Sequence, residues 1–177
     1  MKGRLRVRKL MEEDKSVLVD WLSNPAILEF YEGRDNPFNL EKVNKKFYNR
    51  KDKVNRCIVE YEGVRIGYIQ FYPINHHTSN ITNDSNADVV FGMDQFIGET
   101  MYWNKGIGTA LIQKMVDYLI DKKNVDRIIM DPQTTNKRAL TCYEKCGFKK
   151  VRILPGHELH EGKYRDCWLI EYDTRNG

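Results

Sequence analysis

The sequence predicts a single α/β domain over residues 1–177, in which helices cover the faces of a mixed β-sheet. Three observations support this prediction. The length of 177 residues is typical of one domain. Hydrophobic residues make up 41% and aromatic residues 11%, which excludes a disordered or low-complexity chain. The hydrophobic periods follow the order strand, helix, helix, three strands, helix, strand, helix, two strands.

The first third of the chain predicts one strand and two helices. Residues 5–8 alternate between apolar residues and arginine, which is the period of a half-buried strand. An acidic run at 12–14 opens an amphipathic helix, and an Asn-Pro pair at 24–25 ends it. Residues 30–39 form a loop that is rich in aromatic residues, which suggests a binding lip. A short basic helix, capped by Asn39, reaches about residue 49.

Three strands follow. Residues 56–61 and 65–72 have strand composition, and the turn between them is short enough for a hairpin. Residues 73–87 are polar and aperiodic, so we expect an exposed, mobile loop. Residues 89–97 predict another strand, in which Gly92 indicates a bulge or a close approach of backbone.

The last third alternates helices with strands. Residues 106–123 carry the wide apolar stripe of a buried helix. A brief apolar strand at 127–131 stops before a proline. The next helix runs from an asparagine cap at 136 to a glycine stop at 147. Residues 148–154 and 164–172 supply the last two strands.

The charge is uneven along the chain. The first 53 residues hold 13 basic and 9 acidic side chains, whereas the rest is balanced. This basic excess favours a solvated face over a nucleic-acid patch because acids interleave it. No Lys or Arg occurs between residues 66 and 104, a stretch that carries four acids. Either a cationic small ligand or chance explains that gap. The four acids are Asp84, Asp88, Asp94 and Glu99.

We expect a cytoplasmic protein that binds no membrane, because the sequence has no signal peptide and no apolar run long enough to span a bilayer. The four cysteines include no CxxC pair, so we expect them reduced and mostly buried. Cys142 and Cys146 are four residues apart, and His157 and His160 three, but neither pair completes a metal site. We therefore expect packing roles and no metal.

The strongest local signal is the segment WNKGIGT at residues 103–109, between a strand and a long helix. Glycines let backbone approach an anion, and the unpaired N–H groups of a helix start suit a pyrophosphate. Lys105 adds a full positive charge. The alternative is that these glycines serve helix packing. The segment fits neither GxGxxG nor the Walker pattern, which argues against dinucleotide and nucleoside-triphosphate folds.

A second motif, NKRALTCYEKCGF at residues 136–148, follows the next strand. Together the two motifs resemble the acetyl-coenzyme A (acetyl-CoA) binding core of the GNAT superfamily of N-acetyltransferases, with its Q/R-x-x-G-x-G/A loop and N-x-x-A-x-x-x-Y-x-K-x-G-F helix. The resemblance implies the acyl-CoA N-acyltransferase fold, a mostly antiparallel sheet of about six or seven strands with about four helices. Trp103 stands where the family has Gln or Arg, which removes one expected pyrophosphate contact.

Within the superfamily the chain is most similar to bacterial aminoglycoside 6′-N-acetyltransferases. Several of the similar stretches lie outside the acetyl-CoA core, so the resemblance implies a substrate as well as a cosubstrate. They are LEFYEGRD (28–35), RIGYIQFY (65–72), VFGMDQFIGE (90–99), YWNKGIGT (102–109), MDPQTTNKRAL (130–140) and LPGHELHEGK (154–163).

The resemblance implies that ten residues hold acetyl-CoA. Gly106, Gly108 and their neighbours would hold the pyrophosphate, Asn136 would bond the pantetheine arm, and Tyr143 would face the sulfur. As a general acid Tyr143 could protonate the leaving thiolate. The alternative for Tyr143 is a core aromatic on the helix stripe. The full set is Phe96, Ile97, Lys105, Gly106, Ile107, Gly108, Thr109, Asn136, Ala139 and Tyr143.

The resemblance also implies an acidic acceptor pocket, because aminoglycosides carry several ammonium groups. Asp94 matches the family's acid and is expected to act as the base or to orient the amine. An aspartate of ordinary pKa is a weak base, so either its pKa is raised or it only holds the cation while water takes the proton. The expected acceptor residues are Tyr31, Glu32, Gln70, Asp94, Asp131 and Asp166.

The implied function is transfer of acetyl from acetyl-CoA to the 6′-amine of an aminoglycoside, a reaction that confers antibiotic resistance, by direct attack in a ternary complex. One alternative is acetylation of another amine, such as a polyamine, a protein N-terminus or a siderophore precursor. Another is a non-catalytic acetyl-CoA-binding module, which the presence of Asp94 and Tyr143 disfavours. We expect a monomer or homodimer with a small cationic partner and no nucleic acid.

Overall fold

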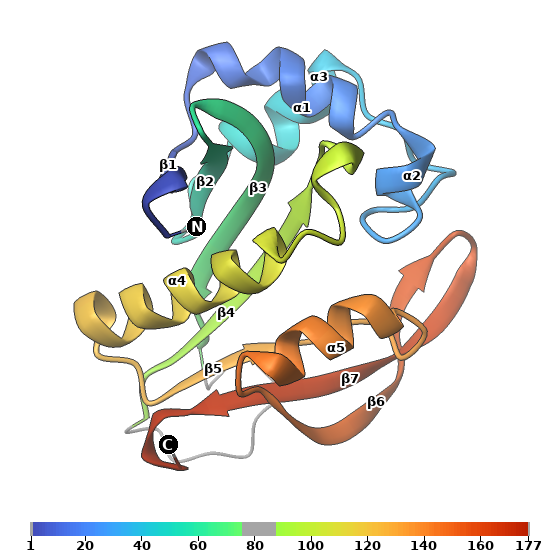
Figure 1. Cartoon of the computed structure of the whole chain (residues 1–177). Coiled ribbons are helices and arrows are strands. Elements are labelled where there is room, and N and C mark those ends of the chain that lie inside the picture. Colours follow the sequence, from blue (N-terminus) through green and yellow to red (C-terminus); the bar gives the residue numbers. More distant parts are fainter. Residues whose placement is uncertain (1, 76–87, 177) are drawn as a thin grey trace.

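The computed structural model describes residues 2–75 and 88–176, in which seven strands form one sheet in the order β1-β2-β3-β4-β5-β7-β6 (Figure 1). Only β4 and β5 are parallel neighbours; the other pairs are antiparallel. The predicted mixed, mostly antiparallel sheet is therefore confirmed. The strands are β1 Leu5–Lys9, β2 Asn55–Tyr61, β3 Val64–Pro73, β4 Val90–Ile97, β5 Arg127–Met130, β6 Lys149–His160 and β7 Lys163–Asp173.

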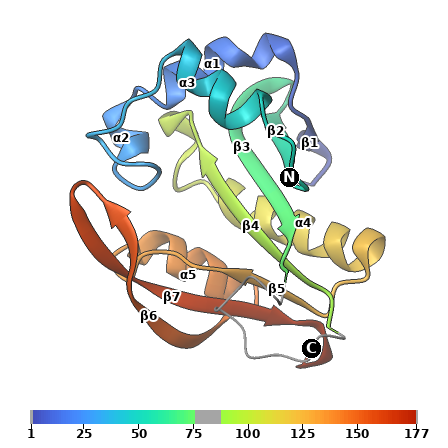
Figure 2. The same ribbon diagram turned by 180° about the vertical axis from the view of Figure 1, so that it is seen from behind.

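Helices cover both faces of the sheet. The long helix α4 and helix α5 lie on one face, where their apolar residues pack on β1 to β5 (Figures 1 and 2). Helices α1 to α3 cover the opposite face of β2 to β4. The helices are α1 Lys15–Trp21, α2 Pro25–Leu28, α3 Leu40–Val43, α4 Ile107–Lys123 and α5 Lys137–Lys145, and the short turns are η1 Lys2–Arg4, η2 Glu12–Asp14, η3 Asn44–Tyr48, η4 Thr100–Tyr102 and η5 Thr174–Asn176.

Two elements differ from the sequence prediction. The Asn-Pro pair that ends the first helix also begins α2, because the Asn24 side chain accepts a hydrogen bond from the Ala26 amide at 3.0 Å. Strand β6 was expected to end at residue 154 but continues to His160. A register shift between Leu154 and Glu158 carries the strand past Gly156, whose φ of +54° suits glycine. The predicted loop at 73–87 lies mostly outside the described residues.

The parallel strands β4 and β5 pair over only three residues and then separate. Val90, Phe91 and Gly92 pair with the start of β5, whereas β4 beyond Gly92 pairs only with β3 among the described strands. Figure 1 shows the two strands diverging from their paired ends. Beyond Gly92 this edge of β4 therefore has no neighbouring strand within the described part of the chain and can face a ligand.

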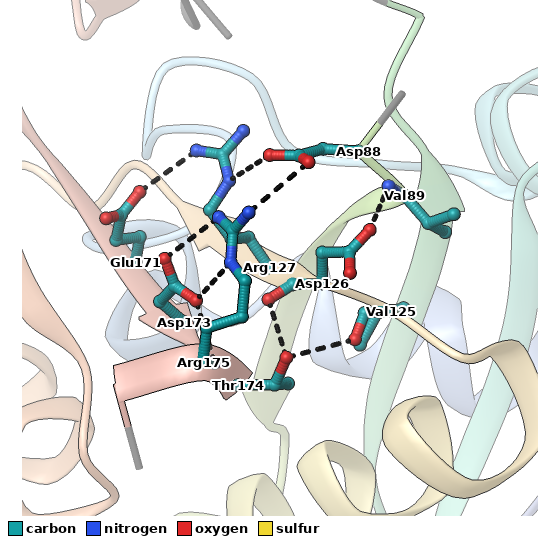
Figure 3. Close-up of polar contacts among 9 residues, drawn as sticks. All are labelled: Asp88, Val89, Val125, Asp126, Arg127, Glu171, Asp173, Thr174 and Arg175. Atoms are coloured by element: carbon teal, nitrogen blue, oxygen red, sulfur yellow. Dashed lines mark hydrogen bonds and ion pairs between the residues drawn. The ribbon is translucent and has the colours of Figure 1, made fainter. Parts of the chain in front are cut away.

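The paired end of β4 and β5 is held by an ion-pair network (Figure 3). Arg127, which is 4% exposed, lies 3.1 Å from Glu171 of β7 and 3.6 Å from Asp88. Arg175 reaches the same Asp88 at 3.4 Å and Asp173 at 3.0 Å. These contacts join the segment before β4 to the start of β5 and the end of β7. Because the cation is buried and paired on two sides, loss of either carboxylate would leave part of a buried charge uncompensated.

The separated end of β4 is held by a tryptophan. The Trp21 ring lies flat against Gly98, the residue after β4, and its Nε1 donates to Glu99 Oε1 at 2.8 Å. The amides of Gly98 and Glu99 both donate to the carbonyl of Ile66 on β3. Trp21 can pack here only because residue 98 is glycine, so the position of the free β4 edge depends on that glycine.

We predict that Gly98→Ala destabilises the protein by about 1–3 kcal/mol, because its Cβ would overlap the buried Trp21 ring. The free energy of unfolding in urea measures this loss. Gly3→Ala is the matched control, since a Cβ at Gly3 meets no atom within 4 Å. If Gly98→Ala and wild type had the same free energy of unfolding, the packing of Trp21 would not require glycine at position 98.

Candidate functional site

A first cavity of about 620 Å³ lies between helices α4 and α5 and the free end of β4; we call it the α4–α5 cavity. Its walls combine apolar groups with three basic side chains from α5, and no Asp or Glu is among the described residues that line it. An interior of this kind suits a ligand with an apolar arm and negative charges. The residues used below are Phe96, Ile97, Gly106, Gly108, Thr109, Asn136, Lys137, Arg138, Ala139, Tyr143 and Lys145.

The glycine-rich segment forms one end of this cavity. Gly106 has a φ of +77° and precedes the first turn of α4. Gly106, Gly108 and Thr109 line the wall, whereas the side chain of Ile107 is buried in the core and Lys105 is exposed outside the lining. A Cβ at Gly108 would contact only Cys142 Sγ at 3.7 Å, so packing within the protein does not demand glycine there. This supports a ligand contact over the packing alternative.

Asn136 and Tyr143 lie on the same face of α5, Asn136 at the start of the helix and Tyr143 near its end. The Asn136 side chain caps the helix by accepting from the Ala139 amide at 3.4 Å. Tyr143 accepts a hydrogen bond from Gln95 Nε2 at 2.6 Å, and burial raises its pKa above the ordinary value. Tyr143 also packs against the hydrophobic core below α4 and α5. It therefore both lines a cavity and contacts the core, the two surroundings between which the sequence did not decide.

A second cavity of about 440 Å³ lies on the other side of Tyr143, between β3, β4, β5, β6 and the loop before α3. Four carboxylates line it, against one lysine and one histidine, and we call it the acidic cavity. The two cavities share Phe30, Tyr31, Gln95, Asn136 and Tyr143. The charged residues of the acidic cavity are Glu32, Lys46, Asp94, Asp131, His157 and Glu158.

Asp94 of β4 lines the acidic cavity. Gln70 Nε2 of β3 donates to its Oδ2 at 2.9 Å, and Gln70 is itself held by the Tyr68 hydroxyl at 2.7 Å. Burial raises the pKa of Asp94 above its ordinary value; the nearby charge of Asp131 acts in the same direction, against the hydrogen bonds from Gln70 and Tyr72. The raised pKa makes this carboxylate a better base than an exposed one.

The other predicted acceptor residues have different surroundings. Asp131 lies 2.7 Å from His157 Nε2, and Glu32 pairs with Lys46. Tyr31 packs on Phe96 with ring centroids 4.6 Å apart. All of these residues except Phe96 line the acidic cavity.

Asp166 lies outside that lining. It is exposed, and its Oδ1 accepts from the Gly156 amide at 2.9 Å, which holds the bulge in β6.

Sequence reasoning missed several lining residues. Gln95 and Tyr72 face the cavities from positions whose neighbours had been singled out, and His157 and Glu158 come from the unpredicted end of β6. Asp94 and Gln95 both line the acidic cavity, and only Gln95 also lines the α4–α5 cavity; the period of two along β4 could have indicated that these adjacent side chains point in different directions. Lys46 gave no signal because it lies within an ordinary basic helix.

The β6–β7 hairpin lines the acidic cavity with His157, Glu158 and Leu159, and its tip contacts the loop before α3. Glu161 accepts three hydrogen bonds from Arg34: two from the guanidinium at 2.6 and 2.8 Å, and one from the backbone amide at 3.1 Å. These bonds lower the pKa of Glu161 to about 2. The contact joins the hairpin to the loop that carries Tyr31 and Glu32, so both walls of the cavity are tied together at this point.

Within residues 2–75 and 88–176, no group of three His, Cys, Asp or Glu side chains is arranged to hold an ion. Cys142 lines the α4–α5 cavity and lies 3.5 Å from the Thr109 hydroxyl, and Cys57 and Cys167 are buried. No described helix is long and apolar enough to cross a membrane.

Comparison with known proteins identifies the class to which this fold and site belong. The family model for the acetyltransferase (GNAT) domain matches residues 10–154, and the chain belongs to this family of acetyltransferases.

Among characterised relatives, it is 29% identical over 147 residues to aminoglycoside N(6′)-acetyltransferase type 1 of Klebsiella pneumoniae, covering 81% of this chain and 73% of the relative. The protein is thus a GNAT acetyltransferase related to the aminoglycoside 6′-acetyltransferases.

Solved structures share the fold. The aminoglycoside acetyltransferase AAC(6′)-Ib in complex with coenzyme A (CoA) and kanamycin has a TM-score of 0.79 at 24% identity, covering 97% of this chain and 95% of that chain. Spermidine N-acetyltransferase from Vibrio cholerae, in complex with CoA and spermine, has a TM-score of 0.77 at 20% identity, covering 98% and 97%. At these identities the likeness shows the fold alone.

We predict that Asp94→Asn makes the protein more thermostable than wild type at neutral pH. A carboxyl whose pKa rises on folding binds its proton more tightly in the folded state, so wild type loses stability as pH increases through the raised pKa. The advantage of the variant should therefore shrink on acidification. Melting temperatures between pH 5 and 8 measure it.

The control variant is Asp52→Asn, which should show the opposite trend. Hydrogen bonds from Arg56 lower the pKa of Asp52, so its carboxylate stabilises the fold at neutral pH and this contribution is lost as pH falls. If Asp94→Asn also melted below wild type at neutral pH, the carboxylate would be a structural ion and not a destabilised functional group.

Proposed function

We propose that this protein transfers the acetyl group of acetyl-CoA to the 6′-amino group of an aminoglycoside by direct attack in a ternary complex. One observation carries the proposal: a cavity lined by basic side chains meets a cavity lined by four carboxylates, and Tyr143 and Gln95 lie where they meet. A polyanionic donor and a polycationic acceptor thus each have a complementary site beside the other. Because acetyl-CoA is an intracellular metabolite, we propose a cytoplasmic enzyme that confers resistance.

The α4–α5 cavity fits acetyl-CoA. The first turn of α4 leaves backbone N–H groups unpaired at Gly106 and beyond, which suits a pyrophosphate, and the basic residues of α5 add charge. The apolar groups deeper in the cavity suit the pantetheine arm. Of the residues expected from the sequence, eight line this cavity and would hold the molecule: Phe96, Ile97, Gly106, Gly108, Thr109, Asn136, Ala139 and Tyr143. The side chains of Lys105 and Ile107 do not line it.

The acidic cavity fits an acceptor with several ammonium groups. Glu32, Asp94 and Asp131 come from three separate elements, so they can engage amines at different positions of one molecule. Gln70 positions the Asp94 carboxylate, and Tyr31 offers an aromatic face to a sugar ring or a cation. Asp166 retains a supporting role, because it holds the β6 bulge beside His157.

Asp94 is proposed to take the proton of the attacking amine. An ammonium is not a nucleophile, so the 6′-amine must lose a proton before its nitrogen attacks the thioester carbonyl. Burial raises the pKa of Asp94 and so brings it closer to the pKa of the ammonium, which makes the proton transfer less unfavourable. The carboxylate also holds the cation in place before the transfer.

Tyr143 is proposed to protonate the sulfur that leaves. Its pKa is raised, so the hydroxyl keeps its proton at neutral pH. Because Gln95 Nε2 donates to the tyrosine oxygen, the hydroxyl hydrogen remains available for a second acceptor. Acetyl-CoA supplies the activated acetyl thioester, and the tyrosine proton would neutralise the thiolate formed when the carbon–sulfur bond breaks.

A second candidate function is acetylation of a linear polyamine. The fold is shared with a spermidine N-acetyltransferase, and a cavity with four carboxylates suits a polyamine as well as an aminoglycoside. Peptide acetylation receives less support, because an extended peptide would need an open groove, whereas the acceptor site here is a cavity lined by four carboxylates. Tyr143 lines both cavities and Asp94 lines the acidic one, which disfavours a non-catalytic binding module.

The experiment that tests this function measures release of the CoA thiol from acetyl-CoA with kanamycin, with an aminoglycoside that carries a hydroxyl at the 6′ position, and with spermidine. We expect rapid turnover with kanamycin only, and about a hundredfold loss of that rate in Asp94→Asn. Turnover with spermidine and none with kanamycin would replace the aminoglycoside with a polyamine. Equal turnover of the amine and the hydroxyl compound would contradict transfer to the 6′ nitrogen.

A further inference from the structure

The basic side chains of the α4–α5 cavity are not those of the glycine-rich loop. Lys137, Arg138 and Lys145 all belong to α5 and line the cavity, whereas Lys105 of the loop does not. At the loop position where the family has Gln or Arg, this chain has Trp103, which cannot bind an anion with a side-chain charge. A cation that supplies this contact instead would have to come from α5, which forms the opposite wall of the cavity.

Arg138 spans the cavity toward that tryptophan. Its guanidinium carbon lies 4.1 Å from the centroid of the Trp103 ring and 5.8 Å from that of Phe30. Trp103 is itself fixed, because its Nε1 donates to the carbonyl of Ile97 at 2.9 Å. A side chain of the α5 first turn thus lies against the β4–α4 loop, and the indole determines where its charge is held.

The contact leaves the hydrogen-bonding edge of Arg138 available. A guanidinium stacks through its flat face, while its five N–H donors lie in the plane and point outward. The contact over the Trp103 ring orders the guanidinium through the ring face and occupies none of its N–H donors with an acceptor atom. No Asp or Glu lines this cavity within the described ranges, so a phosphate would be the matching acceptor for the planar fork.

We propose that Arg138, ordered by Trp103, binds a phosphate group of CoA and replaces the contact that the Trp103 position no longer supplies. This inference rests on acetyl-CoA being the cosubstrate. In this arrangement the Trp103 indole orients the Arg138 guanidinium and does not itself contact the phosphate. The pyrophosphate and the 3′-phosphate offer the same chemistry, and the ligands chosen below distinguish them.

The test measures dissociation constants by calorimetry, without an acceptor, for CoA, 3′-dephospho-CoA and pantetheine. We expect Arg138→Gln to weaken CoA about tenfold, as for loss of one charge-assisted hydrogen bond, and to change the affinity for pantetheine less than twofold. A loss with CoA alone assigns the 3′-phosphate, and an equal loss with dephospho-CoA assigns the pyrophosphate. Arg138→Lys, which keeps the charge but not the stacked fork, should lie between wild type and Arg138→Gln.

Lys122→Gln is the matched control, because Lys122 is exposed near the far end of α4 and does not line the cavity. It removes one positive charge and should leave all three affinities within twofold of wild type. CoA affinity unchanged in Arg138→Gln, or lost equally for pantetheine, would overturn the assignment of Arg138. Wild type that bound no CoA at all would instead overturn the proposed function, so the two failures are distinguishable.

Discussion

The separation of β4 from β5 after three paired residues is the constraint on which the site depends, because it exposes the β4 edge that carries Asp94 to Ile97. Contacts are found at both ends of the opening. The buried Arg127 and its carboxylate partners hold the paired end, and Trp21 packed on Gly98 holds the separated end. Polar groups at the opening are then available to a ligand instead of to a neighbouring strand.

Positively charged and negatively charged side chains lie mainly in different cavities on the two sides of this opening. One cavity has three cations, all from α5, and the other has four carboxylates from separate elements, while the neutral, half-buried pair Tyr143 and Gln95 lies at the boundary. Burial keeps the tyrosine protonated and raises the pKa of Asp94, so low solvent exposure supports both proposed proton transfers. The same burial carries a stability cost at Asp94, which is common at functional sites.

The sequence predicted the element order and most strand positions because hydrophobic period and turn residues are local properties. It did not predict α2, since the Asn-Pro pair that stops one helix also starts the next, or the end of β6, where Pro155 and Gly156 read as a stop but form a bulge. Asp94, Asp131 and Glu32 do line one cavity, whereas Asp166 faces the bulge. Contacts between distant elements, such as Arg138 on Trp103, follow from packing that no local pattern encodes.

Direct transfer requires that donor and acceptor occupy the two adjacent cavities at the same time. Calorimetric titration of kanamycin into the protein, alone and after saturation with CoA, measures whether they do. We expect one molecule of kanamycin bound per chain in both cases, with an affinity in the presence of CoA equal to or tighter than in its absence. If CoA abolished kanamycin binding, the two ligands would compete for one site and direct transfer in a ternary complex would be impossible.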